Sequence, residues 1–195
     1  AKDTDLICVS GNLGAAYCGL QLLEREKSVY YMQLQEARKK NKDAVVDFQP
    51  DFSGREYLLE RQLQPEARGD ILKTLRQAGV RPTSMIDISD GLSSEIMHIC
   101  KESNTGCRLF EKEIPIDYQT AVMAEEMNMN LSTCALNGGE DYELLFTCPI
   151  GDYEKVKELD DIRIIGHITK KELGTLLVTR DGQEFPLKAQ GWQHA

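Results

Sequence analysis

Short apolar runs that end in glycine-containing turns and then give way to helical patterns constrain this chain most. The run Leu6–Val9 enters the turn Ser10–Gly14, and a helical pattern follows as far as Leu23. A second unit of this kind has a strand at Thr83–Ile88 and a helix at about 90–100. Strand and helix patterns that alternate in this way predict a sheet covered by helices. The expected fold class is α+β, a mixed α/β sandwich.

The rest of the chain reads as further short elements. Helices are predicted over 55–63, 68–78, 118–129 and 152–159, and strands over 107–110, 141–148, 163–168 and 175–179. The last two strands are expected to pair, and Asp181-Gly182 is a hairpin signal. Asp152 is expected to cap the helix that follows it. Residues 28–54 are polar and aromatic, and a variable loop or insertion is expected there.

Composition excludes several classes of protein. The 195 residues include 23 basic and 32 acidic side chains, a net charge of −9, which disfavours nucleic acid as a partner. No apolar run approaches the roughly 20 residues of a membrane span, so a membrane protein is not expected. Six cysteines lack any C-x-x-C spacing. They are predicted to be reduced core residues of a cytoplasmic protein.

The first candidate site is the segment Asp87-Ile88-Ser89-Asp90-Gly91-Leu92. Asp87 stands where a strand is predicted to end, and Asp90 stands where a helix begins. Two carboxylates at such a turn can converge on Mg²⁺, which keeps waters and phosphate oxygens in its other positions. The helix N-terminus favours phosphate, and Ser89 adds a hydroxyl. The alternative is that Ser89 or Asp90 only caps the helix.

The second candidate is Asn137-Gly138-Gly139-Glu140-Asp141-Tyr142-Glu143-Leu144. Its glycines permit a sharp turn, and three acidic groups follow. On a strand, Asp141 and Glu143 would share one side and Glu140 and Tyr142 the other. Glu140 is therefore best placed to point into a cleft. The alternative is a hairpin turn with a solvated acidic edge.

Two weaker candidates remain. The turn Gly11–Gly14 is similar to an anion-binding turn, but it lacks the dinucleotide pattern and the P-loop lysine, so a packing role is favoured. Trp192 is the only tryptophan, and it could stack on a ring-bearing ligand or cover the core. His98 and His167 are predicted to be structural.

Taken together, these segments resemble the thiamine-monophosphate kinase family of the aminoimidazole-ribonucleotide-synthetase-like superfamily. The matching segments follow the family's order at 5–20, 60–66, 85–92, 137–146, 165–169 and 191–194. The specific part is the pair D-I-S-D-G-L and G-G-E-D-Y-E-L. Three residues depart from the family pattern: Asn137 replaces Ser, Gln193 replaces Asp and Ala195 replaces Phe.

The resemblance implies a reaction and a set of roles. ATP would transfer its γ-phosphoryl group to thiamine monophosphate, and thiamine diphosphate would form. Asp87 and Asp90 would be Mg²⁺ ligands, and Ser89 would contact ATP. Glu140 and Trp192 would contact the thiamine substrate.

The resemblance covers only the C-terminal half of such an enzyme, which agrees with the missing initiator Met. Residues 1–195 would then be one C-terminal domain, with a strand–turn–helix unit at 1–27, the variable segment at 28–54 and the main body at 55–195. The N-terminal ATP-binding half would supply further metal sites, the remaining ATP contacts and a homodimer interface. The chain alone is therefore expected to be inactive.

Two other functions stay open. A non-catalytic module that binds a cation or docks a partner would carry the same acidic loops. Another ATP-dependent synthetase of the superfamily, such as the purine-pathway cyclase, is the second, although Asp90 and Glu140–Glu143 argue against it.

Overall fold

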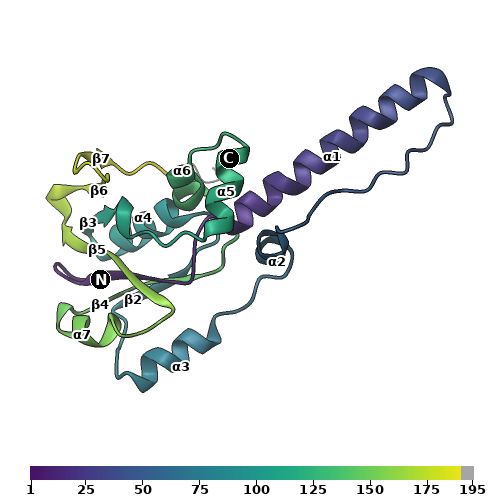
Figure 1. The fold of residues 1–195 in the computed structure, drawn as a ribbon. Coiled ribbons are helices and arrows are strands. Elements are labelled where there is room, and N and C mark those ends of the chain that lie inside the picture. Colours follow the sequence, from purple (N-terminus) through teal and green to yellow (C-terminus); the bar gives the residue numbers. More distant parts are fainter. Residues whose placement is uncertain (190–195) are drawn as a thin grey trace.

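The computed structural model describes residues 1–189, which contain one seven-stranded mixed sheet with helices on both faces (Figure 1). Neighbouring strands are antiparallel, except that β3 and β6 are parallel. This arrangement confirms the predicted α+β class. The strands, in the order β2-β4-β1-β5-β3-β6-β7 across the sheet, are β2 (Ser84–Asp87), β4 (Leu144–Cys148), β1 (Leu6–Ser10), β5 (Ile162–Lys170), β3 (Thr105–Phe110), β6 (Thr175–Val178) and β7 (Glu184–Pro186).

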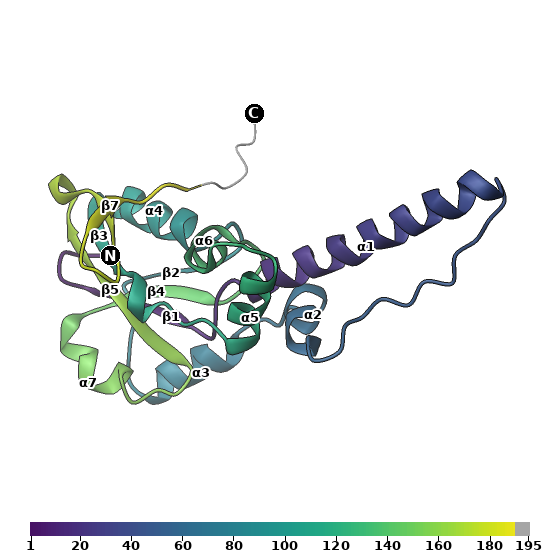
Figure 2. The same cartoon turned by 45° about the horizontal axis from the view of Figure 1, so that its top comes forward.

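Helices α4 and α6 lie on one face of the sheet, and α3 and α7 lie on the other (Figures 1 and 2). No helix within residues 1–189 is both long and apolar enough to cross a membrane. The α-helices are α1 (Ala15–Lys40), α2 (Glu56–Leu63), α3 (Gly69–Gln77), α4 (Leu92–Ser103), α5 (Tyr118–Glu126), α6 (Leu131–Asn137) and α7 (Tyr153–Val156), and 3₁₀ turns lie at Glu111–Glu113, Ile150–Asp152 and Lys171–Leu173.

Strand β1 is buried on both of its faces. Ile7 and Val9 pack in the apolar cluster under α4 and α6, whereas Leu6 and Cys8 pack in the cluster with α3 and α7. A strand covered on both sides needs apolar residues at every position, which explains the unbroken run in the sequence. The turn that follows β1 is therefore held at the end of a rigid central strand.

The six cysteines are free and buried, as predicted. Each of the three apolar clusters of the fold contains one pair of them, and the Sγ atoms of Cys8 and Cys148 lie 4.0 Å apart. A thiol–thiol hydrogen bond, together with burial, raises the pKa of Cys8, Cys18 and Cys107. These thiols act as small packing residues.

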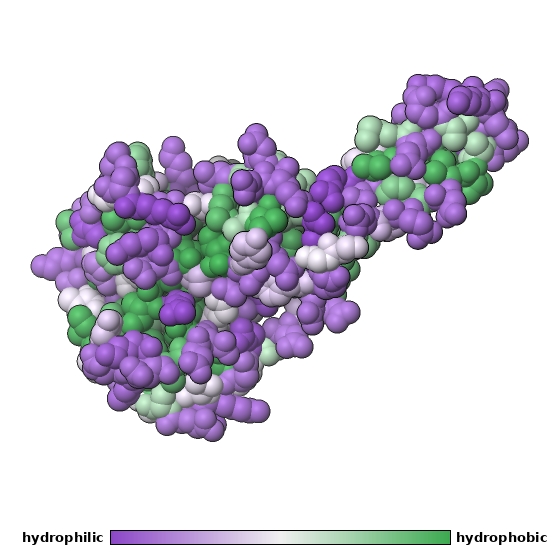
Figure 3. Space-filling view, viewed as in Figure 1, coloured by the Kyte–Doolittle hydropathy of each residue, from purple (hydrophilic) through white to green (hydrophobic). Residues whose placement is uncertain are grey.

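The expectation of a loop over 28–54 is wrong for residues 28–40, because α1 continues to Lys40. This part of α1 is rich in helix-forming Met, Gln, Glu, Ala, Arg and Lys, but no residue after Leu22 is buried. Without a buried stripe the sequence carries no clear helical periodicity. Together with the returning segment it forms an arm, residues 28–50, that projects from the body, whereas Phe52 and Arg55 contact the body again (Figure 1). Apolar side chains gather on the arm, and the most exposed are Tyr31, Met32 and Val45 (Figure 3).

Three smaller expectations need correction. Strands β5 and β6 do not pair, because β3 lies between them. The Asp152 side chain does not cap a helix and instead forms an ion pair with Lys155 at 2.6 Å. Helix α6 was not predicted, since seven residues are too few to show a period. The hairpin at Asp181-Gly182 is confirmed by the pairing of β6 with β7.

Candidate functional site

The first candidate segment forms a sharp elbow between β2 and α4. Strand β2 ends at Asp87, and α4 begins at Leu92 after the N-cap residue Gly91. Gly91 has φ +105°, and a Cβ atom there would lie 3.0 Å from the backbone of Asn137. Only glycine fits both the conformation and the space. The elbow is thereby pressed against the end of α6, where the second candidate segment starts.

Backbone hydrogen bonds join the two candidate segments. The amide of Glu140 donates to the carbonyl of Ser89 at 2.8 Å, and the amide of Tyr142 donates to the carbonyl of Ile88 at 2.9 Å. In return, Ile88 donates to the carbonyl of Glu143 at 2.8 Å. A Cβ on Gly139 would lie 2.6 Å from the Ser89 carbonyl oxygen, so this close approach requires glycine. Two motifs about 50 residues apart in the sequence thus form one surface of the protein.

The elbow carboxylates are available to solvent. Asp87 and Asp90 are exposed, and Ser89 is partly exposed. Neither Ser89 nor Asp90 caps α4 with its side chain, so the capping alternative is wrong. The buried Glu95 holds the elbow instead, because its Oε1 accepts from the Asp90 amide at 3.1 Å and from the Ser89 hydroxyl at 3.4 Å.

Glu140 lies in the loop between α6 and β4. It is exposed, its φ is +67°, and its Oε2 accepts a hydrogen bond from Gln62 Nε2 at 2.7 Å. The predicted strand begins only at Leu144, so residues 141–143 are not part of β4. The expected alternation nevertheless holds: Asp141 and Glu143 are 1% exposed, while Tyr142 faces outward. Trp192 lies outside the described residues.

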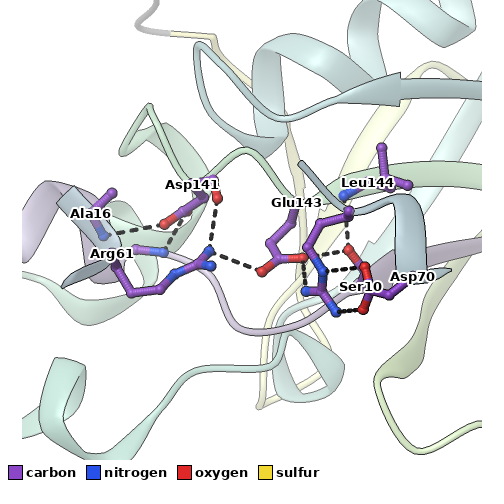
Figure 4. A network of polar contacts seen from close by, with 9 residues as sticks. Ser10, Ala16, Arg61, Asp70, Asp141, Glu143 and Leu144 are labelled. Atoms are coloured by element: carbon purple, nitrogen blue, oxygen red, sulfur yellow. Dashed lines mark hydrogen bonds and ion pairs between the residues drawn. The ribbon is translucent and has the colours of Figure 1, made fainter. Parts of the chain in front are cut away.

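Glu143 is the centre of a buried ion-pair network that the sequence did not predict (Figure 4). Its Oε1 lies 2.9 Å from Arg61 Nη2, and its Oε2 lies 2.5 Å from Arg68 Nη1. The Ser10 hydroxyl donates to Oε2 at 2.5 Å and accepts from the Leu144 amide at 2.8 Å. A charge this deeply buried needs such partners, because desolvation strongly disfavours an unpaired carboxylate.

Asp141 occupies the N-terminus of α1. Its carboxylate accepts from the amides of Gly14 at 2.7 Å and Ala16 at 3.3 Å. Burial raises the pKa of Asp141 to about 7, although the two backbone donors and Arg61 act in the opposite direction. The amides that could have bound an external anion at the Gly11–Gly14 turn therefore serve Asp141. This agrees with the packing role favoured for that turn.

The donor set for a cation is partial. Asp87 and Asp90 offer hard carboxylate oxygens, and neither takes part in an ion pair with a described residue. Within residues 1–189, no group of three or more His, Cys, Asp or Glu side chains could hold a metal ion. Two exposed carboxylates suit Mg²⁺, which takes few protein ligands and binds waters and phosphate oxygens as well.

Comparisons with known proteins define the class of this fold. No protein-family model matches the chain. A solved structure of AaThiL complexed with AMPPCP and TMP superposes on all of this chain and 52% of its own, with a TM-score of 0.72 and 29% identity. The Escherichia coli hydrogenase maturation protein HypE matches 98% of this chain and 52% of its own, with a TM-score of 0.64 and 16% identity, which shows the fold alone. The fold is that of the aminoimidazole-ribonucleotide-synthetase-like proteins.

Within that class the sequence is similar to the thiamine-monophosphate kinases. The enzyme of Aquifex aeolicus is 30% identical over 194 residues, which cover 100% of this chain and 53% of the relative. The resemblance predicted from the two acidic motifs is therefore confirmed. The chain spans about half the length of the curated relatives it matches.

Proposed function

We propose that this chain provides one half of an ATP-dependent thiamine-monophosphate kinase, which converts thiamine monophosphate to thiamine diphosphate. The observation that carries the proposal is the backbone pairing of the Ser89 elbow with the Glu140 loop, in a chain whose whole length matches 53% of such a kinase. The neighbour solved with AMPPCP and TMP supports a nucleotide and a phosphorylated acceptor as ligands.

The proposed roles follow from what each side chain offers. Asp87 and Asp90 would hold Mg²⁺, which offsets negative charge on phosphoryl oxygens when it is bound. The Ser89 hydroxyl would contact ATP. Glu140, exposed beside the elbow, would contact the thiamine part of the substrate, and Trp192 is proposed for the same ligand.

Phosphoryl transfer asks the protein mainly for in-line positioning and charge stabilisation. The acceptor is a phosphate that is already ionised near pH 7, so no strong general base is needed. Repulsion between the two anionic substrates is the main obstacle. An elbow of exposed carboxylates is suited to this task only if a cation stands between it and the phosphates, which is why the proposal includes Mg²⁺.

The setting of the enzyme is part of the proposal. Six buried thiols that form no disulfide suit a reducing compartment, so we place the protein in the cytoplasm. The homodimer implied by the resemblance would form through the half of these kinases that this chain does not match. The net charge of −9 continues to disfavour nucleic acid.

The test is the substitution Asp90→Asn in the intact gene product, with thiamine diphosphate formation measured across Mg²⁺ concentrations. Removing one ligand should reduce turnover at limiting Mg²⁺ by about 100-fold. Asp43→Asn, on the projecting arm, makes the same charge change and should leave turnover unaltered. Near-normal turnover of Asp90→Asn would refute the metal role.

A calorimetric titration of the intact gene product separates this function from a non-catalytic binding module. The kinase should bind both thiamine monophosphate and Mg-ATP, whereas a docking module should bind neither. The identity of 30% with a thiamine-monophosphate kinase over the whole of this chain supports the kinase over another synthetase of the superfamily.

A further inference from the structure

The loop that carries Glu140 is held in an unfavourable backbone conformation. Glu140 has φ +67° and Tyr142 has φ +50°, so two non-glycine residues are left-handed with a single residue between them. Side chains with a Cβ rarely adopt this conformation. It persists only where surrounding contacts over-determine it, and such places cluster at functional sites.

The residues that alternate with these two supply those contacts. Asp141 and Glu143 point inward and are 1% exposed. Asp141 binds the start of α1 through its carboxylate, and its carbonyl accepts from Arg61 Nη2 at 2.7 Å. Glu143 binds Arg61 and Arg68 as described above. The loop is therefore fixed to α1, to α2 and to the segment just before α3 (Figure 4).

The network contains the guanidinium groups of Arg61 and Arg68 and the carboxylates of Asp141, Glu143 and Asp70, and Asp70, which pairs with Arg68 at 3.0 Å, is the only one of the five that is exposed. The Arg61 and Arg68 side chains are only 17% and 14% exposed, and the Glu143 side chain is 2% exposed. Loss of Glu143 leaves Arg61 without an ion-pair partner among the described residues, and loss of either arginine leaves the buried Glu143 carboxylate with one guanidinium partner instead of two. The loop must then rearrange to hydrate the poorly compensated charge. The geometry of the loop thus depends on Glu143 and on both arginines.

The same loop determines where Glu140 lies relative to the elbow. The amides of Glu140 and Tyr142 bond to the elbow carbonyls of Ser89 and Ile88. On α2, Arg61 contacts the buried side of the loop, while the next residue, Gln62, donates to the Glu140 carboxylate. Helix α2 therefore contacts the loop both on its buried side, through Arg61, and at the exposed Glu140 carboxylate, through Gln62.

We propose that Arg61, Arg68 and Glu143 are positioning residues: they hold the left-handed turn of residues 140–142 and so keep the Glu140 carboxylate beside the Ser89 elbow. The functional consequence rests on the proposed function, in which Glu140 contacts thiamine monophosphate. The network would act on binding of that substrate through Glu140, and binding of ATP would be unaffected.

Hydrogen exchange of the 195-residue chain tests the positioning itself. Glu143→Gln should speed exchange of the Glu140 and Tyr142 amides by about tenfold or more, while the amides that join β3 to β5 keep their rates. If Glu143→Gln fails to fold, Arg68→Lys takes its place. This variant keeps the positive charge but loses the planar guanidinium, so it should give the same pattern of exchange more weakly. Glu184→Gln, which breaks the exposed Arg108–Glu184 pair, is the matched control. Unchanged exchange at residues 140 and 142, or a rise shared equally by the β3–β5 amides, would overturn the proposal.

Kinetics of the intact gene product test the functional consequence. Arg68→Lys should raise KM for thiamine monophosphate by about tenfold and leave KM for ATP unaltered. In a Glu140→Gln background the same change should have almost no further effect, because both substitutions act through one carboxylate. Additive effects would contradict action through Glu140. If Glu140→Gln itself leaves KM unaltered, the proposed substrate role of Glu140 fails, and the exchange experiment still decides the positioning role.

Discussion

Gly19→Ala is expected to destabilise the fold by forcing α1 and α2 apart. Gly19 is buried in α1, and a Cβ atom there would lie 2.2 Å from the carbonyl oxygen of Leu58 and 3.0 Å from Cβ of Gln62. A carbon–oxygen contact needs roughly 1 Å more than this. Because the obstacle is backbone, no side-chain rotation can relieve it, and α2 must move as a unit.

The magnitude follows from two opposing effects. Overpacking that shifts a helix costs about 3 kcal/mol at the upper end of its range, and Leu58, which is fully buried, loses contacts as α2 moves. Alanine is a better helix former than glycine by about 1 kcal/mol. The net loss in the free energy of unfolding is then about 2 kcal/mol. For a domain of this size that corresponds to a fall in Tm of about 4–8 °C.

Urea unfolding followed by far-UV circular dichroism measures this difference. Gly69→Ala is the matched control, because Gly69 begins α3, is exposed, and has no atom within 4 Å of its would-be Cβ. This control should be neutral or slightly stabilising. If Gly19→Ala is as stable as Gly69→Ala, then α1 and α2 do not pack at this distance, and the placement of Arg61 and Gln62 against the Glu140 loop is wrong as well.

Two further predictions concern buried titratable groups. The folded-state pKa of Asp141, about 7, is raised above its ordinary value of 3.8, so this group favours folding below pH 4 and the benefit is lost as the pH rises toward 7. Asp141→Asn should therefore weaken the fall in the free energy of unfolding between pH 4 and 7, measured by urea titrations; an unaltered slope would contradict the raised pKa. The six cysteines should react with a thiol reagent only as fast as the protein unfolds. Rapid reaction of the thiols in the native chain would show that the reagent reaches the apolar clusters without unfolding.

Local patterns in the sequence were enough to predict the class of the fold. Short unbroken apolar runs, together with patterns of period two or 3.6, predicted the strands from β1 to β6 and most of the helices, because burial on two faces or on one imposes those patterns directly. The outer half of α1 was missed because its residues are exposed, so only helix propensity acts on them. The order of the strands in the sheet could not be predicted from the sequence either. The placement of β3 between β5 and β6 depends on contacts between distant segments.

The candidate site was predicted in part for a similar reason. Asp87, Ser89, Asp90 and Glu140 lie at turns, where glycines next to acidic residues give a local signal. The network of Ser10, Arg61, Arg68 and Glu143 has no such signal, since its members come from four separate segments. Gly11 belongs to the surroundings of this network, because a Cβ there would lie 2.3 Å from the Glu143 carboxylate. A glycine that leaves space for a buried charge can be recognised only once that charge is placed.

The acidic motif Glu140–Glu143 therefore contains two kinds of carboxylate, which have different roles. Asp141 and Glu143 are buried, and arginine side chains and helix amides stabilise their carboxylates. Glu140 is exposed, so it is the carboxylate of the motif that a ligand can reach. The alternation requires left-handed backbone at residues 140 and 142, so the inward pair must supply the contacts that make the strained turn stable. A charge reversal in the inward pair should consequently disturb substrate binding without touching substrate. A chemically identical reversal at Glu140 would act on the ligand itself, and the two cases are separated by whether the exchange rates of the loop amides change.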